Sequence, residues 1–308
     1  MVHERPKWFS NLSKKELIDR IDARSDKAYF IGDSREYLLD GVNLSNTKLV
    51  RIGLSDTTMI GANLSNTDLT EADLFHANLT NANLTKANLT NANLTNADLS
   101  YINLTKAKLM GANLTNANLI NANLTNANFT NADLIDADIS NANLTNANLT
   151  NANLTNADLS YTNLTKAKLM GANLTNADLS YTNLTNADLI DADISNANLT
   201  QANLTNANLT NADLIDADIS NANLTQANLT NANLTNADLI DADISNANLT
   251  NAKVSRNQLG QCTARPRFGG WGPKFLGSVL WVWLLSLVTL SWKALKAWIA
   301  FISDKLKK

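Results

Sequence analysis

The sequence contains few of the residues on which disulfide-rich, metal-binding and enzymatic proteins depend. Its 308 residues include one cysteine, Cys262, two histidines, His3 and His76, and three prolines. One cysteine cannot form an internal disulfide, and two histidines far apart in the sequence are a poor basis for a metal site. Serine, threonine and aspartate are abundant but have no histidine partner for nucleophilic catalysis. These absences predict a protein that is not an enzyme and needs no cofactor or metal.

The start of the sequence does not read as a secretory leader. The opening stretch MVHERPKWFSNLSKKE is charged, whereas a signal peptide has a short basic region followed by an apolar run. Together with the single cysteine, this predicts a reducing, cytoplasmic location for most of the chain.

Charge is distributed unevenly along the sequence. The net charge of -3 is the sum of +1 over residues 1–61, -13 over residues 62–252 and +9 over residues 253–308. A strongly acidic middle is therefore followed by a basic and apolar C-terminal part.

The dominant pattern in the sequence is a period of five residues. Leucine or a close substitute recurs at every fifth position from Leu44 to Val254, which gives 43 units in one register. On an α-helix, a step of five residues turns by about 140°, so the leucines would not share a face. On a continuous strand, an odd period would place them alternately on both faces. Neither regular element can use this pattern.

A second small or apolar residue, usually alanine, lies two positions before each leucine, as in Ala142-Asn143-Leu144. Residues two apart point to the same side of an extended segment. Each unit can therefore be three extended residues followed by a corner, with asparagine tolerating the backbone angles that a corner needs. The chain is then predicted to coil around a core of alanine and leucine.

These residues resemble a known family. The run Ala82-Asn83-Leu84-Thr85-Lys86 is similar to the repeats of pentapeptide-repeat proteins, and the resemblance covers about two-thirds of the chain. It implies an all-β solenoid, a right-handed quadrilateral β-helix with four units per coil and each leucine stacked on the leucine four units later. The 43 units would then form a rod about 50 Å long. The family is abundant in cyanobacteria, so the resemblance also implies a cyanobacterial source.

The repeats contain many Asn-x-Thr triplets, such as Asn143-Leu144-Thr145, which match the acceptor motif for N-glycosylation. In the coiled arrangement Leu144 fills the interior, while Asn143 and Thr145 remain outside. We therefore expect the triplet to be a consequence of the repeat and to carry no sugar.

The sequence is divided by composition into four segments. Ser13 and Glu16 have the spacing of a capping box at the start of a short helix, which is expected to cap the rod. The stretch GQCTARPRFGGWGP has the composition of a linker. The predicted segments are an N-terminal cap with a short helix (1–38), the repeat β-helix (39–259), a linker (260–274) and a C-terminal hydrophobic and amphipathic α-helix (275–308).

The C-terminal segment predicts a membrane span. The stretch FLGSVLWVWLLSLVTLSW, residues 275–292, has 18 residues without a charge, the lower limit for crossing a hydrocarbon core about 30 Å thick. The prediction is a single-pass helix that contacts lipid and leaves the repeat rod in the cytoplasm. The residues that represent the span are Phe275, Leu280, Trp283, Leu287 and Trp292.

Two alternatives to a span remain open. Serine, threonine and lysine residues of this segment fall within about 120° on a helix, which would also suit a helix lying flat on a membrane. A helix buried in a soluble protein is the third arrangement, although the rod offers no spare apolar face. Basic residues on both sides of the segment leave its orientation undecided.

One block of aromatic and basic residues breaks the repeat pattern. Tyr161 and Tyr181 are four units apart and are predicted to be neighbours on adjacent coils, with Lys166 and Lys168 nearby. Tyrosine is favoured at protein interfaces, so these four residues form a candidate partner patch. A duplicated block explains them equally well, because residues 161–177 nearly copy residues 101–117.

These features predict a non-catalytic, membrane-tethered scaffold or protein–protein interaction module with an unidentified protein partner. The alternative is a DNA-mimic regulator of a topoisomerase-like enzyme, because some members of the family bind such enzymes in that way. The net charge of -13 is less than half that of DNA of equal length, and the acidic motif NADLIDADIS shifts between faces and is not expected to form a stripe. A third reading is a rod that binds nothing specific. The sequence does not favour nucleic-acid or small-molecule partners and leaves homo-oligomerisation open.

Overall fold

The computed structural model describes residues 37–263, together with residues 13, 15, 16 and 19. The chain divides into two compact units, Met1–Arg267 and Phe268–Lys308, and the second unit lies outside the described residues.

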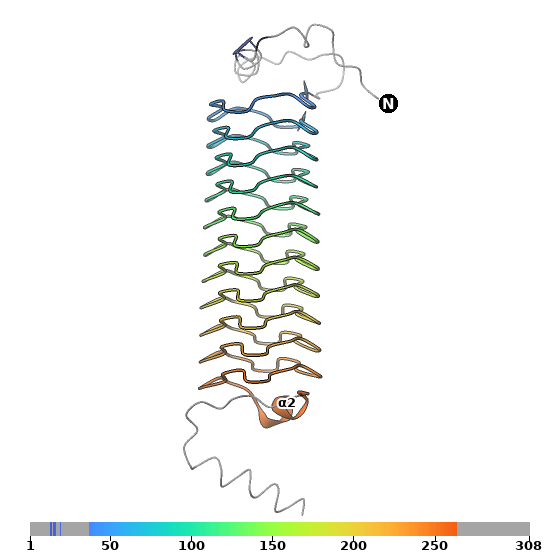
Figure 1. Cartoon of the computed structure of the whole chain (residues 1–308), viewed down its shortest axis with the longest axis vertical. Coiled ribbons are helices and arrows are strands. Elements are labelled where there is room, and N and C mark those ends of the chain that lie inside the picture. Colours follow the sequence, from blue (N-terminus) through green and yellow to red (C-terminus); the bar gives the residue numbers. More distant parts are fainter. Residues whose placement is uncertain (1–12, 14, 17–18, 20–36, 264–308) are drawn as a thin grey trace, which may run out of the picture. The chain divides into compact units, whose positions relative to one another are not determined.

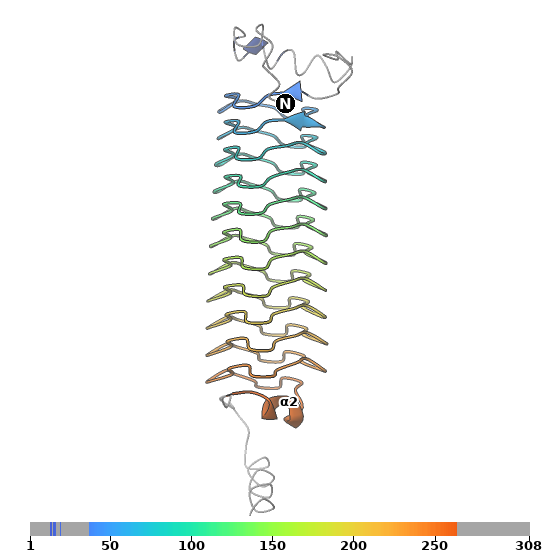
Figure 2. The ribbon, with the colours of Figure 1, turned by 90° about the vertical axis from the view of Figure 1, so that its right-hand side faces the viewer.

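Residues 37–263 form a stack of parallel coils (Figures 1 and 2). Strand β1 (Tyr37–Leu38) pairs in parallel with β2 (Thr57–Thr58), and helix α2 (Arg256–Gly260) follows the last coil. Between them, single parallel bridges join the residue before each buried leucine position to its counterpart four units later, from Asn43 with Asn63 to Asn233 with Lys253. Because four units of five complete one turn of the chain, each coil has four sides, as predicted.

The core is a continuous column of leucine and alanine inside the coils. It extends from Leu39 to Leu249 as one cluster, and its leucines are nearly all less than 4% exposed. Phe129 takes one leucine position and is fully buried. Burying a leucine stabilises a protein by about 1.5–3 kcal/mol, so the core has ample driving force although no single coil could fold alone. The five-residue period therefore exists because it returns a leucine to the interior on every side.

Every corner of the coils has the same backbone geometry. The second residue after each leucine has a φ between 53° and 64°, as in Asn146 at 57°. The next alanine donates a backbone hydrogen bond to the leucine carbonyl, as Ala147 does to Leu144 at 2.9 Å. A positive φ only at the third residue of such a turn is the pattern of type II. Asparagine tolerates this region better than other residues with a side chain, which explains its frequency there.

All five backbone amides of a typical unit find a partner, as residues 142–146 show. Ala142 donates to the preceding turn, Asn143 to Ala122 of the coil before, and Leu144 and Asn146 to Asn163 and Thr165 of the coil after. The fifth amide, that of Thr145, donates to Asn143 Oδ1 at 3.0 Å. The coil is thus held by complete pairing of its donors as well as by its core.

The same asparagine accounts for the Asn-x-Thr triplets. Asn143 Oδ1 also accepts a hydrogen bond from Thr145 Oγ1 at 2.6 Å, and most other Asn-x-Thr units repeat the two bonds. This is an Asx turn, in which the side-chain oxygen accepts a hydrogen bond from a backbone amide that has no carbonyl partner on a neighbouring coil. The triplet therefore has a structural role in each corner.

Replacing Asn143 with alanine removes the acceptor of both bonds. We expect Asn143→Ala to destabilise the protein by about 1 kcal/mol, because Thr145 is partly exposed and water replaces part of the loss. Asn143→Asp keeps the oxygen and should leave stability within about 0.5 kcal/mol of the wild type. Urea unfolding of both variants provides the measurement. Equal losses from the two substitutions would show that the oxygen is not what matters.

The C-terminal end of the stack is closed by α2. Ser255 caps this helix in a capping box with Gln258. The Gln258 amide Nε2 donates to the carbonyls of Leu234 and Ala237 at 2.7 and 2.8 Å. Leu259 and Cys262 pack against the core, and burial raises the pKa of the Cys262 thiol. Residues 260–263, which the sequence predicts to belong to a linker, lie against the last coils, because Gln261 accepts from the Asp241 amide and the Thr263 amide donates to Ala242.

Near the N-terminus, the described residues show the expected pairing of Ser13 with Glu16. Glu16 Oε2 accepts from the Ser13 amide at 2.8 Å, and Ser13 Oγ accepts from the Glu16 amide at 3.3 Å. Residues 15, 16 and 19 are helical, and the rest of the predicted cap before residue 37 lies outside the described residues.

The predicted membrane localisation is wrong. In the part of the chain that the structure describes, no helix has the length and apolarity needed to cross a membrane. The helix that follows the coils, α2, has five residues, whereas a span takes about 20. The expected single-pass C-terminal helix, its lipid contact and the tethering of the repeats are therefore unsupported. The residues on which the prediction rested, Phe275, Leu280, Trp283, Leu287 and Trp292, lie outside the described residues.

Candidate interaction surface

Each side of the coil stack is identified by its column of outward residues immediately before the buried leucines. Successive members of a column are paired in register, one coil apart. The asparagine face runs from Asn43 to Asp243, the lysine face from Lys48 to Asn248, the mixed face from Gly53 to Lys253, and the aspartate face from Thr58 to Asp238.

The corner residues with positive φ form four further columns, here called edges. Three of them have a distinct chemistry. The tyrosine edge, between the aspartate and asparagine faces, carries Tyr101, Tyr161 and Tyr181; the lysine edge, between the asparagine and lysine faces, carries Lys86, Lys106 and Lys166; and the acidic edge, between the mixed and aspartate faces, carries Asp56, Asp136 and Asp216.

Charge is separated between opposite sides of the stack. Of the 18 acidic residues between positions 62 and 252, twelve lie on the mixed face, the acidic edge and the aspartate face. All five lysines of the same range lie on the lysine edge and the lysine face, across the coil. The aspartate face alone carries Asp98, Asp138, Asp158, Asp178, Asp218 and Asp238.

The acidic motif is not expected to form a stripe by itself, and the aspartate column arises from the motif together with other aspartates. The motif NADLIDADIS does move between faces, but its copies at 131 and 211 are separated by four whole coils and therefore coincide. Asp98, Asp158 and Asp178, which lie outside the motif, fall into the same column. The stripe comes from these separate aspartates and could not be seen from the motif alone.

Three carboxyl groups show a lowered pKa. For Asp68, the hydroxyl of Thr70 is the main cause, with a hydrogen bond of 2.5 Å to Oδ1. For Asp218, burial alone would raise the pKa, but hydrogen bonds from Ser220 and Thr200 outweigh it and lower the value. For Asp243, the side chain and backbone of Ser245 lower it. All three shifts arise mainly from corner hydrogen bonds, since none of these carboxylates forms a salt bridge within the described residues.

Because these pKa values are lowered in the folded state, the free energy of unfolding is expected to decrease at acidic pH. A carboxyl whose pKa is lower in the folded state stabilises the protein above its unfolded pKa of about 3.9, and this contribution is lost as pH falls through the folded value. We therefore expect the triple variant Asp68→Asn, Asp218→Asn, Asp243→Asn to lose less stability than the wild type between about pH 5 and pH 2. Asparagine keeps the acceptor oxygen and cannot titrate. Urea unfolding at several pH values measures the two slopes, and identical slopes would contradict the assignment.

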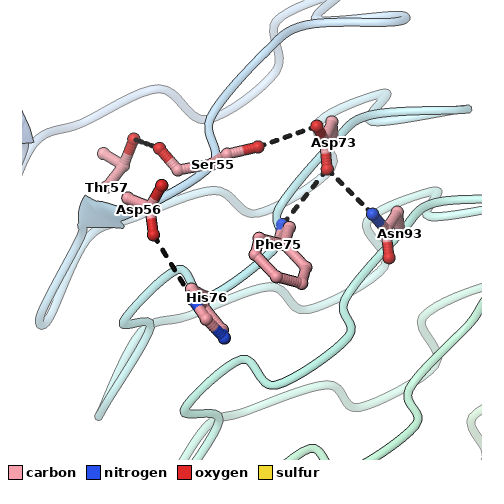
Figure 3. A network of polar contacts seen from close by, with 7 residues as sticks. All are labelled: Ser55, Asp56, Thr57, Asp73, Phe75, His76 and Asn93. Atoms are coloured by element: carbon pink, nitrogen blue, oxygen red, sulfur yellow. Dashed lines mark hydrogen bonds and ion pairs between the residues drawn. The ribbon is translucent and has the colours of Figure 1, made fainter.

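The mixed face and the acidic edge carry a polar network in the first coils (Figure 3). Asp73 accepts from Ser55 Oγ at 2.7 Å and from Asn93 Nδ2 at 3.0 Å, so one carboxylate links side chains of three successive coils. His76 Nδ1 lies 3.4 Å from Asp56 Oδ1, and its ring stacks on Phe75 with centroids 4.0 Å apart. His76 is thereby engaged with a carboxylate and an aromatic ring. In the described residues, no group of three or more His, Cys, Asp or Glu side chains has metal-binding geometry.

The tyrosine edge shows the largest departure from the polar pattern. The rings of Tyr161 and Tyr181 stack with centroids 4.7 Å apart and an angle of 3° between their planes. The two residues are 58% and 44% exposed. Among the exposed large hydrophobic residues of the described region, they are the pair that occupies the same position on successive coils. Tyr161 and Tyr181 are therefore neighbours on adjacent coils, as predicted.

The two lysines of the candidate patch lie apart from the tyrosine pair. Lys166 is on the lysine edge, one full side of the coil from Tyr161, and Lys168 lies beyond it on the lysine face. Three extended residues span about 10 Å, so one partner could contact the tyrosines and Lys166 only across the asparagine face. The structure brings the tyrosines together and does not bring the lysines to them. The role of all four residues in binding stays a prediction.

Comparison with known proteins identifies the class to which this chain belongs. The family model described as pentapeptide repeats matches eight copies between residues 38 and 256, so the chain belongs to the pentapeptide-repeat family. The predicted right-handed quadrilateral β-helix is thereby confirmed as the fold of the repeats. No curated protein matches the chain.

Solved structures of the same family are similar to this chain. HetL, a pentapeptide repeat protein involved in heterocyst differentiation regulation from the cyanobacterium Nostoc sp. strain PCC 7120, is 34% identical over 71% of this chain and 88% of its own, with a TM-score of 0.30. A pentapeptide repeat protein of the Arabidopsis thaliana thylakoid lumen is 25% identical over 40% and 67%, with a TM-score of 0.26. QnrB1, a plasmid-mediated fluoroquinolone resistance protein, is 19% identical over 72% and 93%, with a TM-score of 0.28. The cyanobacterial source of this chain stays a prediction.

Proposed function

We propose that this protein is a non-catalytic scaffold or protein–protein interaction module, and that the tyrosine edge is a surface on which a partner protein binds. The observation that carries the proposal is the exposed, stacked pair of Tyr161 and Tyr181. Exposed aromatic side chains supply large apolar contact area with little loss of rotamer freedom on binding.

The fold gives no reason for tyrosine at these positions. Both residues lie at corners with a φ near 57°, where a tyrosine is less favourable than asparagine. The other corners of the same column include Asn121, Asn141 and Asn221 with equivalent φ values. A residue that the backbone disfavours and that the core does not use is a good candidate for a surface role.

Restoring asparagine gives a sharp test, because Tyr161→Asn with Tyr181→Asn returns both corners to the common residue. The full-length protein and this double variant are immobilised and exposed to an extract of the source organism. We expect a partner protein that is retained by the wild type and lost by the double variant. Tyr101→Asn is the matched control, since it makes the same change on the same edge three coils away.

Two results would contradict the proposal. If the same proteins are retained by the wild type and by Tyr161→Asn/Tyr181→Asn, the tyrosine edge is not the binding surface. If no protein is retained above the level of an empty matrix, the interaction module itself is rejected.

A second function, DNA mimicry toward a topoisomerase-like enzyme, is favoured by the separation of charge. Twelve acidic residues lie on one side between Asp73 and Asp238, which are about eight coils or about 40 Å apart. That is about one charge per 3.3 Å, close to the spacing along one strand of duplex DNA. The test is inhibition of DNA supercoiling by a type II topoisomerase. Inhibition that disappears when aspartates of the aspartate face are changed to asparagine supports mimicry, and no inhibition at a large excess of protein rejects it.

A further inference from the structure

Each tyrosine of the tyrosine edge follows an aspartate of the neighbouring aspartate face: Tyr101 follows Asp98, Tyr161 follows Asp158 and Tyr181 follows Asp178. The sequence Asp-Leu-Ser-Tyr ends at Tyr161 and at Tyr181, and it places Asp158 and Asp178 three residues earlier. These two aspartates are paired in register on successive coils. The stacked rings therefore have a matching pair of carboxylates beside them.

The acidic column continues for one coil beyond the tyrosine pair. Asp138 is paired in register with Asp158, so three carboxylates occupy successive coils about 4.8 Å apart. The Oδ1 atoms of Asp138, Asp158 and Asp178 accept from the amides of Ser140, Ser160 and Ser180 at 2.8–3.0 Å. These bonds fix the side chains and leave their negative charges uncompensated, because no ion pair in the described residues involves them.

The tyrosine stack ends at Tyr161, one coil after Asp138. On the coil of Asp138 the corner residue is Asn141, a much smaller side chain than the Tyr161 that follows it in the column. Tyr181 covers one face of the Tyr161 ring at 4.7 Å, and the opposite face is directed along the column toward this smaller residue. A planar cation stacked there would extend the ladder by one step, with Asp138 on the same coil and Asp158 on the next.

We propose that this surface, made of Asp138, Asp158, Asp178, Tyr161 and Tyr181, binds an extended arginine-rich segment of a partner protein. The inference rests on the proposed function and names the chemistry of the partner. A guanidinium stacks on an aromatic face and binds carboxylates through its planar donors, whereas a lysine ammonium offers only a point charge. The rings and the carboxylates are each repeated at the coil spacing, which suits a segment with several arginines.

The binding of a fluorescent octa-arginine peptide to the full-length protein tests this inference. Tyr161→Asn/Tyr181→Asn and Asp158→Asn/Asp178→Asn should each weaken binding at least about 10-fold, as measured by fluorescence anisotropy at fixed salt. Asparagine keeps the corner geometry at the first pair and the Oδ1 acceptor at the second, so both variants should fold.

A matched acidic pair on another face distinguishes binding at a specific site from general electrostatic attraction of the peptide. Asp193 and Asp213 are paired on successive coils of the mixed face, and Asp193→Asn/Asp213→Asn removes the same two charges. We expect this control to weaken binding less than about 3-fold, because distant charges are screened. Equal weakening by the two aspartate pairs, unchanged binding after loss of the tyrosines, or no binding of octa-arginine would overturn the inference. If the extract partner still depends on the tyrosines in that case, the proposed function stands and only the arginine chemistry is rejected.

Discussion

Leu144→Lys should prevent the central coils from forming, whereas Asn146→Lys, two residues later, should leave the protein folded. Leu144 is 1% exposed, inside a column made mainly of leucine and alanine, and the buried residues of the described part of the chain include no carboxylate that could pair with an ammonium group. Burying an unpaired charge of this kind costs more than about 4 kcal/mol. Because the coil interior is continuous and narrow, the side chain has no route to solvent without opening the coil.

The variant Asn146→Lys serves as the control because it adds the same charge on the outer surface of the coil. Lys106 and Lys166 already occupy equivalent corners with φ near 60°, so a lysine is compatible with that backbone. Circular dichroism and limited proteolysis distinguish the two variants. A folded, protease-resistant Leu144→Lys protein would show that the leucine column is not the core.

Gln258→Leu should open the C-terminal end of the stack and promote association between molecules. The Gln258 side chain donates to the carbonyls of Leu234 and Ala237 and also accepts from the Ser255 amide at 2.8 Å. The Leu234 carbonyl keeps the amide of Ala237 as a donor at 3.1 Å, whereas the Ala237 carbonyl loses its donor, which costs about 1–3 kcal/mol. An uncovered end of a β-solenoid also exposes strand edges with unpaired backbone groups to other molecules.

Gln258→Glu divides the two roles of this side chain. The carboxylate still accepts from Ser255 and completes the capping box, but it cannot donate to the two carbonyls. We expect Gln258→Glu to lose stability nearly as Gln258→Leu does, by about 1–3 kcal/mol at the C-terminal end. Hydrogen exchange of residues 234–263 and light scattering provide the measurements. Exchange and scattering like those of the wild type in both variants would exclude an end cap at Gln258.

The repeat fold could be predicted from the sequence because its signal is repeated at every side of every coil. The leucine at each fifth residue and the alanine two positions before it specify the interior, and their spacing excludes a helix or a flat sheet. The corner asparagines follow from the need for a positive φ. Each of these requirements is local, so a five-residue unit contains it completely.

Two local features and one that spans several coils did not follow from the repeat pattern. The hydrogen bonds of Asn143 with Thr145 were missed because the triplet was interpreted only as what remains outside the core. The end cap was missed although Ser255 and Gln258 have capping-box spacing, because the nearby glycine and prolines suggested a linker. Arranging the sequence in rows of one coil each would have shown the aspartate face.

The candidate patch was predicted in part. Tyr161 and Tyr181 were correctly predicted to be neighbours, because residues 20 positions apart occupy the same place on successive coils. A separation of one unit, as between Tyr161 and Lys166, moves a residue to the next edge, so the lysines lie elsewhere on the surface. The membrane prediction rested on residues 275–292, which lie outside the described residues, and the described residues contain no helix that could cross a membrane.

The most direct test of the tyrosine edge as a binding surface is hydroxyl-radical footprinting of the tyrosines, with and without the partner retained in the pull-down. Tyr101 and Tyr161 lie on the same edge and are 59% and 58% exposed, so they should react equally in the free protein. With the partner bound, we expect Tyr161 and Tyr181 to be protected several-fold while Tyr101 keeps its reactivity. Equal reactivity of all three tyrosines in the bound and free protein would contradict the proposed binding surface.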